Sequence, residues 1–167
     1  VGLLMEKELN YLSKATHDQA RPYVLVVGGS KVSSKIHPLQ KLIPLTDQVL
    51  IGGAMAYTFL KAQGKGIGSS IVEEDKIDQV KEILAKAQQL NIDIKLPSDH
   101  IVSSQVNASA NPQISSNIPD GLIGVDIGPS TCKKYAKAIG RAGTVVWNGP
   151  MGVFELDQFS QGTMKIA

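Results

Sequence analysis

The chain has 167 residues, with 17 basic and 15 acidic side chains, a formal net charge of +2 and 43% apolar residues. This composition is typical of one folded globular domain and excludes an intrinsically disordered chain. The near-neutral charge gives no support for binding to nucleic acid or to an anionic membrane, and no apolar run reaches the roughly 18 residues of a membrane span. The single cysteine, Cys132, cannot form an intrachain disulfide, so we expect a reducing, cytoplasmic location.

Four short segments predict β-strands, because each is rich in aliphatic residues and ends close to glycine, proline or asparagine. These segments are residues 23–27, 48–51, 91–96 and 144–147. Runs that are apolar throughout are typical of strands covered on both faces, as in a parallel sheet.

Helical patterns alternate with these strands. The predicted helices are residues 54–63, 73–90, 130–138 and 158–167, with an opening helix through Met5, Leu9 and Leu12. The helix over 73–90 places Ile77, Val80, Leu84 and Ala87 on one face, and Ser70 with Glu73 indicates a capping box at its start. The alternation predicts an α/β fold, an open and mostly parallel sheet with helices on both faces in three layers.

Two stretches depart from this alternation. Residues 97–121 are rich in Ser, Asn and Pro, and we expect a surface excursion with one or two short strands, for example at 100–102. The last predicted helix has no stop signal after Ala167, and the chain begins at Val1 instead of Met. We therefore expect a chain truncated at its C-terminus and also at its N-terminus.

Three of the predicted strands end in glycine-rich turns, at 28–31, 52–54 and 148–152. Parallel strands joined by right-handed crossovers bring these turns to one edge of the sheet, where backbone N–H groups favour an anionic ligand. Lys31 and Lys35 are four residues apart, so we expect both ammonium groups on one face of a helix start, where a ligand anion would balance them. Neither the P-loop pattern nor the dinucleotide fingerprint is present.

Simpler interpretations of these features also exist. The glycines could make tight turns only, with both lysines solvated. Residues 147–155 contain a proline, several polar or flexible residues and an acid within nine positions, which is unusual for a simple connection. The acid, Glu155, could accept hydrogen bonds from ribose hydroxyls. The three histidines fit no metal-ligand spacing, and we expect Cys132 to be buried and unreactive, so no protein-held metal site is predicted.

Four segments resemble the phosphoglycerate kinase family: VVGGSKVSSK (26–35), IGGAMAYTF (51–59), GVDIGP (124–129) and VWNGPMGVFE (146–155). The segment LMEKEL (4–9) fits as well, and the matches follow the family's order along nearly the whole chain. The resemblance implies that residues 1–167 are most of the Rossmann-like, C-terminal, nucleotide-binding domain. The substrate-binding N-terminal domain and the later Gly-Gly-Gly-Asp segment would then be absent.

The resemblance also implies the reaction, a reversible transfer of the acyl phosphate of 1,3-bisphosphoglycerate to Mg-ADP that gives 3-phosphoglycerate and ATP. Lys31, beside Ser30, would stabilise the phosphoryl group in transfer, Lys35 would bind the nucleotide phosphates, and Glu155 would hold the ribose. Mg²⁺ would be carried with ADP or ATP. The adenine pocket would be lined by the helix that follows Gly53 and by Gly52, Gly53, Gly124, Val125, Asn148, Gly149, Pro150 and Val153.

The sequence departs from the family's pattern at Ser34, where many members have Asp, and at Ala54, which replaces a third glycine. We expect the isolated chain to be a monomer that binds nucleotide weakly and gives no turnover. Two alternatives remain at this point: a non-catalytic nucleotide- or anion-binding module, and an α/β domain without a ligand. We expect neither nucleic acid nor a membrane among its partners.

Overall fold

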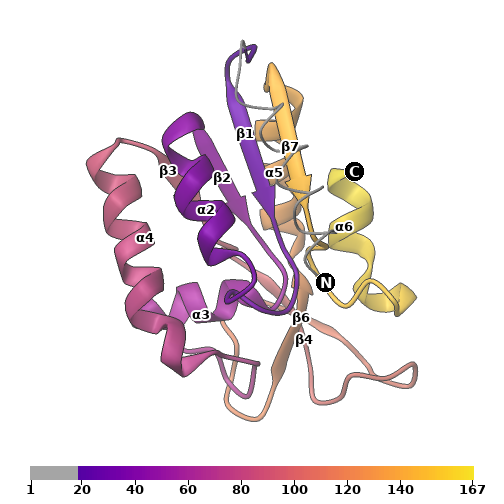
Figure 1. Ribbon diagram of the computed structural model, residues 1–167. Coiled ribbons are helices and arrows are strands. Elements are labelled where there is room, and N and C mark those ends of the chain that lie inside the picture. Colours follow the sequence, from indigo (N-terminus) through magenta and orange to yellow (C-terminus); the bar gives the residue numbers. More distant parts are fainter. Residues whose placement is uncertain (1–18) are drawn as a thin grey trace, which may run out of the picture.

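The computed structural model describes residues 19–167, and its centre is a four-stranded parallel sheet (Figure 1). The strand order is β3-β2-β1-β7, with every neighbouring pair parallel. The four predicted strands are confirmed as β1 (Tyr23–Val27), β2 (Gln48–Ile51), β3 (Asp93–Lys95) and β7 (Thr144–Asn148). The third is shorter than expected, because Asn91 takes a left-handed backbone conformation, with φ of 55°, as the chain leaves the preceding helix.

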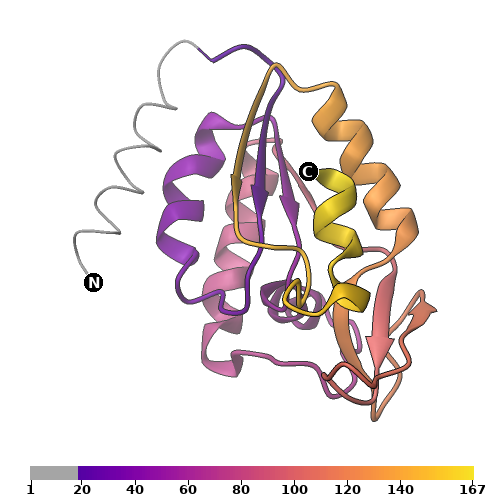
Figure 2. The ribbon, with the colours of Figure 1, turned by 90° about the vertical axis from the view of Figure 1, so that its right-hand side faces the viewer.

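Helices cover both faces of this sheet, as predicted. Figure 2 shows α2 (Ile36–Leu42) and α4 (Ile77–Gln89) on one side and α5 (Pro129–Gly140) and α6 (Gln161–Ile166) on the other. Helix α3 (Met55–Ala62) packs with the first group. Short 3₁₀ helices occupy Ile43–Leu45, Glu74–Lys76 and Asp157–Phe159.

The alternation of side chains along β1 explains the three layers. Leu25 and Val27 pack in the core beneath α2, α3 and α4, whereas Val24 and Val26 pack in the core beneath α5 and α6. All five residues of β1 are buried. Successive side chains of a strand point to opposite faces, so an uninterrupted apolar strand needs apolar cover on both.

A second, antiparallel sheet lies beyond the carboxyl ends of β1 and β2 (Figure 1). It has the order β5-β4-β6, with β4 (His100–Ser103), β5 (Gln113–Ser115) and β6 (Ile123–Ile127). The expectation of one or two short strands within 97–121 is thus confirmed by β4 and β5. Strand β6 was not among the predicted strands, because Gly124 and Asp126 interrupt its apolar pattern.

The structure corrects three details of the helix predictions. The predicted helix over 73–90 begins with the 3₁₀ helix Glu74–Lys76, and α4 starts only at Ile77. Its buried face is formed by Val80, Ile83 and Ala87, whereas Leu84 is half-buried beside it. The predicted helix over 158–167 is divided between the 3₁₀ helix Asp157–Phe159 and the short helix α6.

The capping box between Ser70 and Glu73 is wrong. The Ser70 hydroxyl accepts a hydrogen bond from the Gly124 N–H at 2.9 Å, and the Glu73 carboxylate accepts one from the Ser33 N–H at 3.0 Å. Both side chains therefore join distant segments, and neither caps a helix. The prediction that Lys31 lies on a helix start is also wrong, because α2 begins at Ile36 with Lys35 as its N-cap residue.

Part of the sequence analysis concerns residues before the described range. The opening helix through Met5, Leu9 and Leu12, the segment at 4–9 and His17 lie outside the described residues. Between residues 19 and 167, no helix has the length and apolar character needed to cross a membrane.

Candidate functional site

Three glycine-rich turns meet at the carboxyl edge of the parallel sheet, and we call them together the rim (residues 28–31, 52–54 and 148–152). The Gly28 N–H donates to the Asn148 carbonyl at 2.9 Å, and the Gly29 N–H donates to the Pro150 carbonyl at 2.9 Å. The Gly53 N–H donates to the Met151 carbonyl at 2.8 Å. The expectation that one edge collects all three turns is therefore confirmed.

Glycine is required at two positions of the rim for steric reasons. A Cβ on Gly28 would lie 2.1 Å from the Pro150 carbonyl oxygen, and a Cβ on Gly53 would lie 2.5 Å from both the N and O atoms of Gly29. Gly53 also has φ of 66°, which side-chain-bearing residues rarely adopt. The contact between the turns thus depends on bare backbone at these two positions.

The two candidate lysines lie beside the first turn in different environments. Lys35 is half-buried, and its ammonium donates a hydrogen bond to the Asn148 side-chain oxygen. Lys31 is exposed, and within residues 19–167 its ammonium forms neither a hydrogen bond nor an ion pair. The Ser34 hydroxyl donates to the Lys31 carbonyl at 2.9 Å, which stabilises the turn, while Ser30 is exposed. One lysine is thus fixed at the rim and the other can follow a ligand.

The loop that follows β7 contacts the antiparallel sheet. The Val153 N–H donates to the Val125 carbonyl at 2.9 Å, which brings two residues of the predicted adenine pocket together. Glu155 is exposed two residues further along the loop. A cavity of about 370 Å³ lies beside this loop, lined by Trp147, Gly149, Pro150, Phe154 and Thr163.

Tyr57 lies against Gly124, and although its helix was expected at the adenine pocket, the residue itself was not named among the predicted site residues. A Cβ on Gly124 would lie 2.3 Å from the Tyr57 hydroxyl oxygen, so only glycine fits at this position. Burial raises the pKa of Tyr57 well above its ordinary value of 10.0, and the nearby Asp126 adds to this effect, so the phenol stays neutral. Tyr57 lies within the segment AMAYTF (54–59), but the periodicity of a helix does not distinguish a site residue from a core residue.

Asp126 is the second residue that the sequence analysis missed as a site component. Its carboxylate is buried and accepts hydrogen bonds from the Gly162 N–H at 2.6 Å and from the Ile127 N–H at 2.8 Å. Burial raises its pKa to about 6, although these N–H groups and Lys165 favour the charged form. An acid inside an otherwise apolar segment was the available sequence signal, since buried carboxylates need partners. Asp126 anchors the start of α6 to β6.

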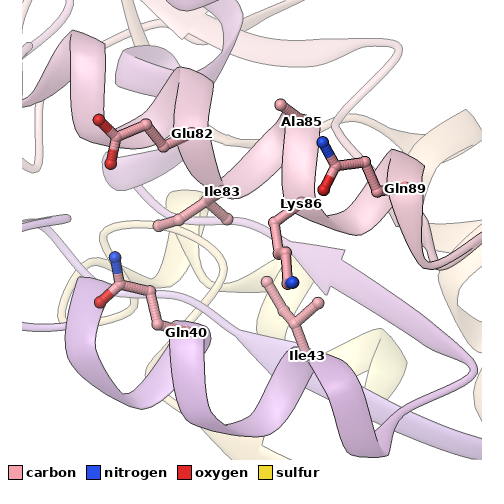
Figure 3. A pocket seen from close by; sticks show the side chains of 7 residues that line it. All are labelled: Gln40, Ile43, Glu82, Ile83, Ala85, Lys86 and Gln89. Atoms are coloured by element: carbon pink, nitrogen blue, oxygen red, sulfur yellow. The ribbon is translucent and has the colours of Figure 1, made fainter.

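Another cavity lies away from the rim. It has a volume of about 430 Å³ and is formed between α2 and α4, as Figure 3 shows. None of its lining residues belongs to the three turns. It is lined by Gln40, Ile43, Glu82, Ile83, Ala85, Lys86 and Gln89. Of these, Glu82 and Lys86 are the only charged residues, and they do not form a catalytic arrangement for group transfer. The volume of a cavity therefore does not by itself identify the functional site.

The chemistry of the rim suits an anion more than a metal ion. The Gly28 and Gly29 N–H groups are already bonded to carbonyls of the third turn, so the cationic groups beside the first turn are the ammonium groups of Lys31 and Lys35. Within residues 19–167 no group of three or more His, Cys, Asp or Glu side chains could hold a metal. Mg²⁺ keeps several waters and is usually bound together with substrate phosphates, so the donors present fit a magnesium-bound nucleotide through its phosphates.

Comparison with known proteins adds independent information. The sequence model of the family described as phosphoglycerate kinase matches residues 1–167. A phosphoglycerate kinase from Solibacter usitatus is 51% identical over 166 residues, covering 99% of this chain and 42% of that protein. One from Chlorobium phaeobacteroides is 49% identical over 168 residues, with the same coverage.

Solved structures give the same result at the level of the fold. The structure of phosphoglycerate kinase from Coxiella burnetii matches with a TM-score of 0.90 at 42% sequence identity. The match covers 98% of this chain and 42% of that one. The chain therefore spans about two fifths of the length of these relatives.

Proposed function

The chain belongs to the phosphoglycerate kinase family, and from this premise we propose that it forms the nucleotide-binding part of an enzyme that makes ATP. In the proposed reaction the acyl phosphate of 1,3-bisphosphoglycerate passes to Mg-ADP, and 3-phosphoglycerate and ATP are formed reversibly. The observation that carries the proposal is the rim, where three hydrogen-bonded glycine turns meet beside Lys31 and Lys35.

In the transfer step an oxygen of the ADP β-phosphate attacks the acyl phosphorus. The bond from that phosphorus to the carboxyl oxygen breaks, and the carboxylate of 3-phosphoglycerate leaves with the electron pair. Such transfers depend on positioning and charge neutralisation more than on covalent chemistry by the protein. The half-buried Lys35 would hold the nucleotide phosphates, and the exposed Lys31 would follow the phosphoryl group, because a lysine is a point charge on a flexible stem.

The nucleoside would lie along the part of the rim formed by the second and third turns. Gly52 and Gly53 precede α3, and the loop from Asn148 to Val153 is tied to both the first turn and β6. In this proposal Gly124 and Val125 complete the adenine pocket, and Glu155 hydrogen-bonds the ribose. Mg²⁺ bound with the nucleotide would supply positive charge to the phosphate oxygens.

The acyl phosphate would reach the rim from the domain that the relatives carry in addition to this region. The two substrates would then meet by domain closure, as in other enzymes that hold substrates on separate bodies. We propose that residues 1–167 alone bind nucleotide weakly as a monomer and give no turnover. The sequence has one cysteine, Cys132, which cannot form an intrachain disulfide, and this suits a reducing, cytoplasmic location.

Two measurements test the proposal. The full-length protein that carries this chain is assayed for ATP formation from ADP and 1,3-bisphosphoglycerate, and residues 1–167 are titrated with ADP and AMP by calorimetry. We expect ATP formation by the full-length protein, and ADP binding to the chain at least about fivefold tighter than AMP binding, because in this proposal Lys35 would contact the added phosphate. Nucleotide binding without transfer in the full-length protein would support a non-catalytic module instead. Near-normal ATP formation by residues 1–167 alone would contradict the proposed inactivity.

A further inference from the structure

Glu73 brings a carboxylate to the turn that carries both candidate lysines. The Ser33 N–H donates to the Glu73 Oε2 atom at 3.0 Å, and Ser33 lies midway between Lys31 and Lys35. Forty residues separate the two partners along the chain. A hydrogen bond between a backbone N–H and a charged acceptor is stronger than one between neutral groups.

The turn has no helix of its own to keep its shape. Helix α2 starts only at Ile36, and the turn before it is closed by hydrogen bonds from the Lys35 and Ile36 N–H groups to the Val32 carbonyl, at 2.8 and 3.0 Å. Neither of these bonds involves the Ser33 N–H. Val32 anchors one side of the turn, because its side chain is fully buried in the core beneath α2. Ser33 is exposed, and Glu73 supplies the matching anchor on that side.

Glu73 is itself fixed to α3. Its backbone N–H donates to the Thr58 hydroxyl oxygen at 3.2 Å, and the Thr58 side chain is buried within α3. The next residue, Glu74, forms an ion pair with Lys61 of the same helix, but this pair is exposed and adds little to the attachment. Helix α3 begins directly after the Gly52–Gly53 turn, so Glu73 connects the lysine-bearing turn to the element that starts at the second turn of the rim.

The charge state of Glu73 is consistent with this contact. Burial alone would raise the pKa of the carboxyl, but hydrogen bonds from Ser33 and from the Val32 N–H outweigh it and lower the pKa below its ordinary value. The carboxylate is therefore ionised at neutral pH, and it remains an acceptor for the turn under the conditions of the reaction.

We propose that Glu73 is a positioning residue for phosphoryl transfer, which holds the backbone between Lys31 and Lys35 so that both ammonium groups converge on the phosphates. The inference rests on the proposed function. Glu73 contacts the turn and not the substrate, so it acts through the lysines. A small displacement of groups that hold a reacting phosphate is costly, since transfer depends on their alignment.

The kinetic test uses the full-length protein with Glu73→Ala, Glu73→Gln and, as a matched control, Glu74→Ala. We expect Glu73→Ala to lower kcat about tenfold and to raise the KM for ADP less than threefold, because the lysines remain but lose their alignment. Glu73→Gln should stay within about twofold of the parent, since the amide oxygen accepts the same hydrogen bond. Glu74→Ala removes the same charge one residue away and should also stay within about twofold.

Hydrogen exchange of the Ser33 amide gives a readout that does not depend on catalysis. We expect exchange at Ser33 to be at least about tenfold faster in Glu73→Ala and unchanged in Glu74→Ala. If Glu73→Ala does not fold, Thr58→Val replaces it, because this variant removes the hydroxyl that accepts the Glu73 N–H. We expect Thr58→Val to lower kcat about threefold. Thr58→Ser keeps the hydroxyl and is the control.

Three results would overturn the inference. The first is unchanged kcat in Glu73→Ala, and the second is unchanged exchange of the Ser33 amide. The third is a Glu73→Gln variant as impaired as Glu73→Ala, which would assign the effect to charge instead of position. An inactive parent protein that still showed the exchange difference would refute the proposed function while leaving the hydrogen bond in place.

Discussion

The parallel and antiparallel sheets of this chain are built on different principles. The parallel sheet buries apolar side chains on both faces, and its turns are joined by backbone hydrogen bonds. The antiparallel sheet buries polar groups, among them His100, Ser103 and Asp126. Packing of apolar side chains holds the strands of the first sheet in place. In the second sheet, a polar side chain such as Asp126 forms hydrogen bonds to a neighbouring segment.

The two sheets cooperate at the loop that follows β7. This loop leaves the parallel sheet at Asn148 and reaches the antiparallel sheet through the hydrogen bond between Val153 and Val125. Asp126 then fixes Gly162 at the start of α6. The region proposed to bind the nucleoside is thus held at one end by backbone packing and at the other by a buried carboxylate. Four predictions test this division, from the largest effect to the smallest.

Gly53→Ala tests the dependence of the parallel sheet's turns on close backbone approach. The new Cβ would lie 2.5 Å from Gly29 N and O, and φ is 66°, so we expect a loss of about 4 kcal/mol in the free energy of unfolding. Gly121→Ala is the control, because Gly121 has a similar φ of 81° but no atom within 4 Å of the added Cβ. It should cost about 1 kcal/mol by urea denaturation, and equal costs for the two variants would contradict the account.

Asp126→Asn tests the buried carboxylate of the antiparallel sheet through pH. Burial raises the pKa of Asp126 from 3.8 to about 6, so the folded chain binds this proton more tightly than the unfolded chain. Its stabilising contribution is complete below about pH 4 and is lost as the pH rises to about 6, by about 3 kcal/mol. The variant lacks this loss, so the difference in unfolding free energy between variant and parent should shift in the variant's favour across that range. A difference that does not change with pH would contradict the burial of an ionisable group there.

Lys31→Ala tests whether the rim carries the chemistry. In the full-length protein we expect kcat to fall about 100-fold, equivalent to about 2.7 kcal/mol, with little effect on stability because the side chain is exposed. Lys41→Ala removes an exposed lysine near the other end of α2 and should change kcat less than about twofold. A change below about threefold for Lys31→Ala in the transfer assay would remove this lysine from the mechanism.

Tyr135→Phe tests a polar contact within the mainly apolar packing of the parallel sheet. The Tyr135 hydroxyl lies 2.6 Å from the Ile51 carbonyl, which is buried, and 3.0 Å from the Lys95 carbonyl, so its loss removes a buried hydrogen bond. We expect a cost of about 1.5 kcal/mol in thermal or urea unfolding. Tyr23→Phe is the matched control, since the buried Tyr23 hydroxyl has no partner among residues 19–167, and it should cost less than about 0.5 kcal/mol. The reverse order of the two costs would contradict the hydrogen-bond assignment.

The predictability of the fold follows the same division between sheets. Strands β1, β2 and β7 were predicted closely because their composition and their glycine endings are local properties of the sequence. Strand β6 was missed because Gly124 and Asp126 are required by tertiary contacts, with Tyr57 and with Gly162 respectively. A periodicity analysis has no information on such partners.

The candidate site shows the same limit. The meeting of the three turns followed from strand direction and handedness, and it is confirmed by their backbone hydrogen bonds. The roles of individual residues in nucleotide binding came from family resemblance and remain predictions. Glu73 was predicted to cap a helix, because Ser-x-x-Glu before an apolar run fits the local pattern of a capping box. Its hydrogen-bond partner in the structure is the Ser33 N–H, 40 residues away along the chain.

The most direct measurement is a structure of this chain, or of the full-length protein that carries it, soaked with a non-hydrolysable ATP analogue. We expect the phosphates beside Lys31 and Lys35, and the base between the Gly52–Gly53 turn and the loop that carries Val153. An analogue seated in the cavity between α2 and α4, with no density along the rim, would contradict the proposed nucleotide site.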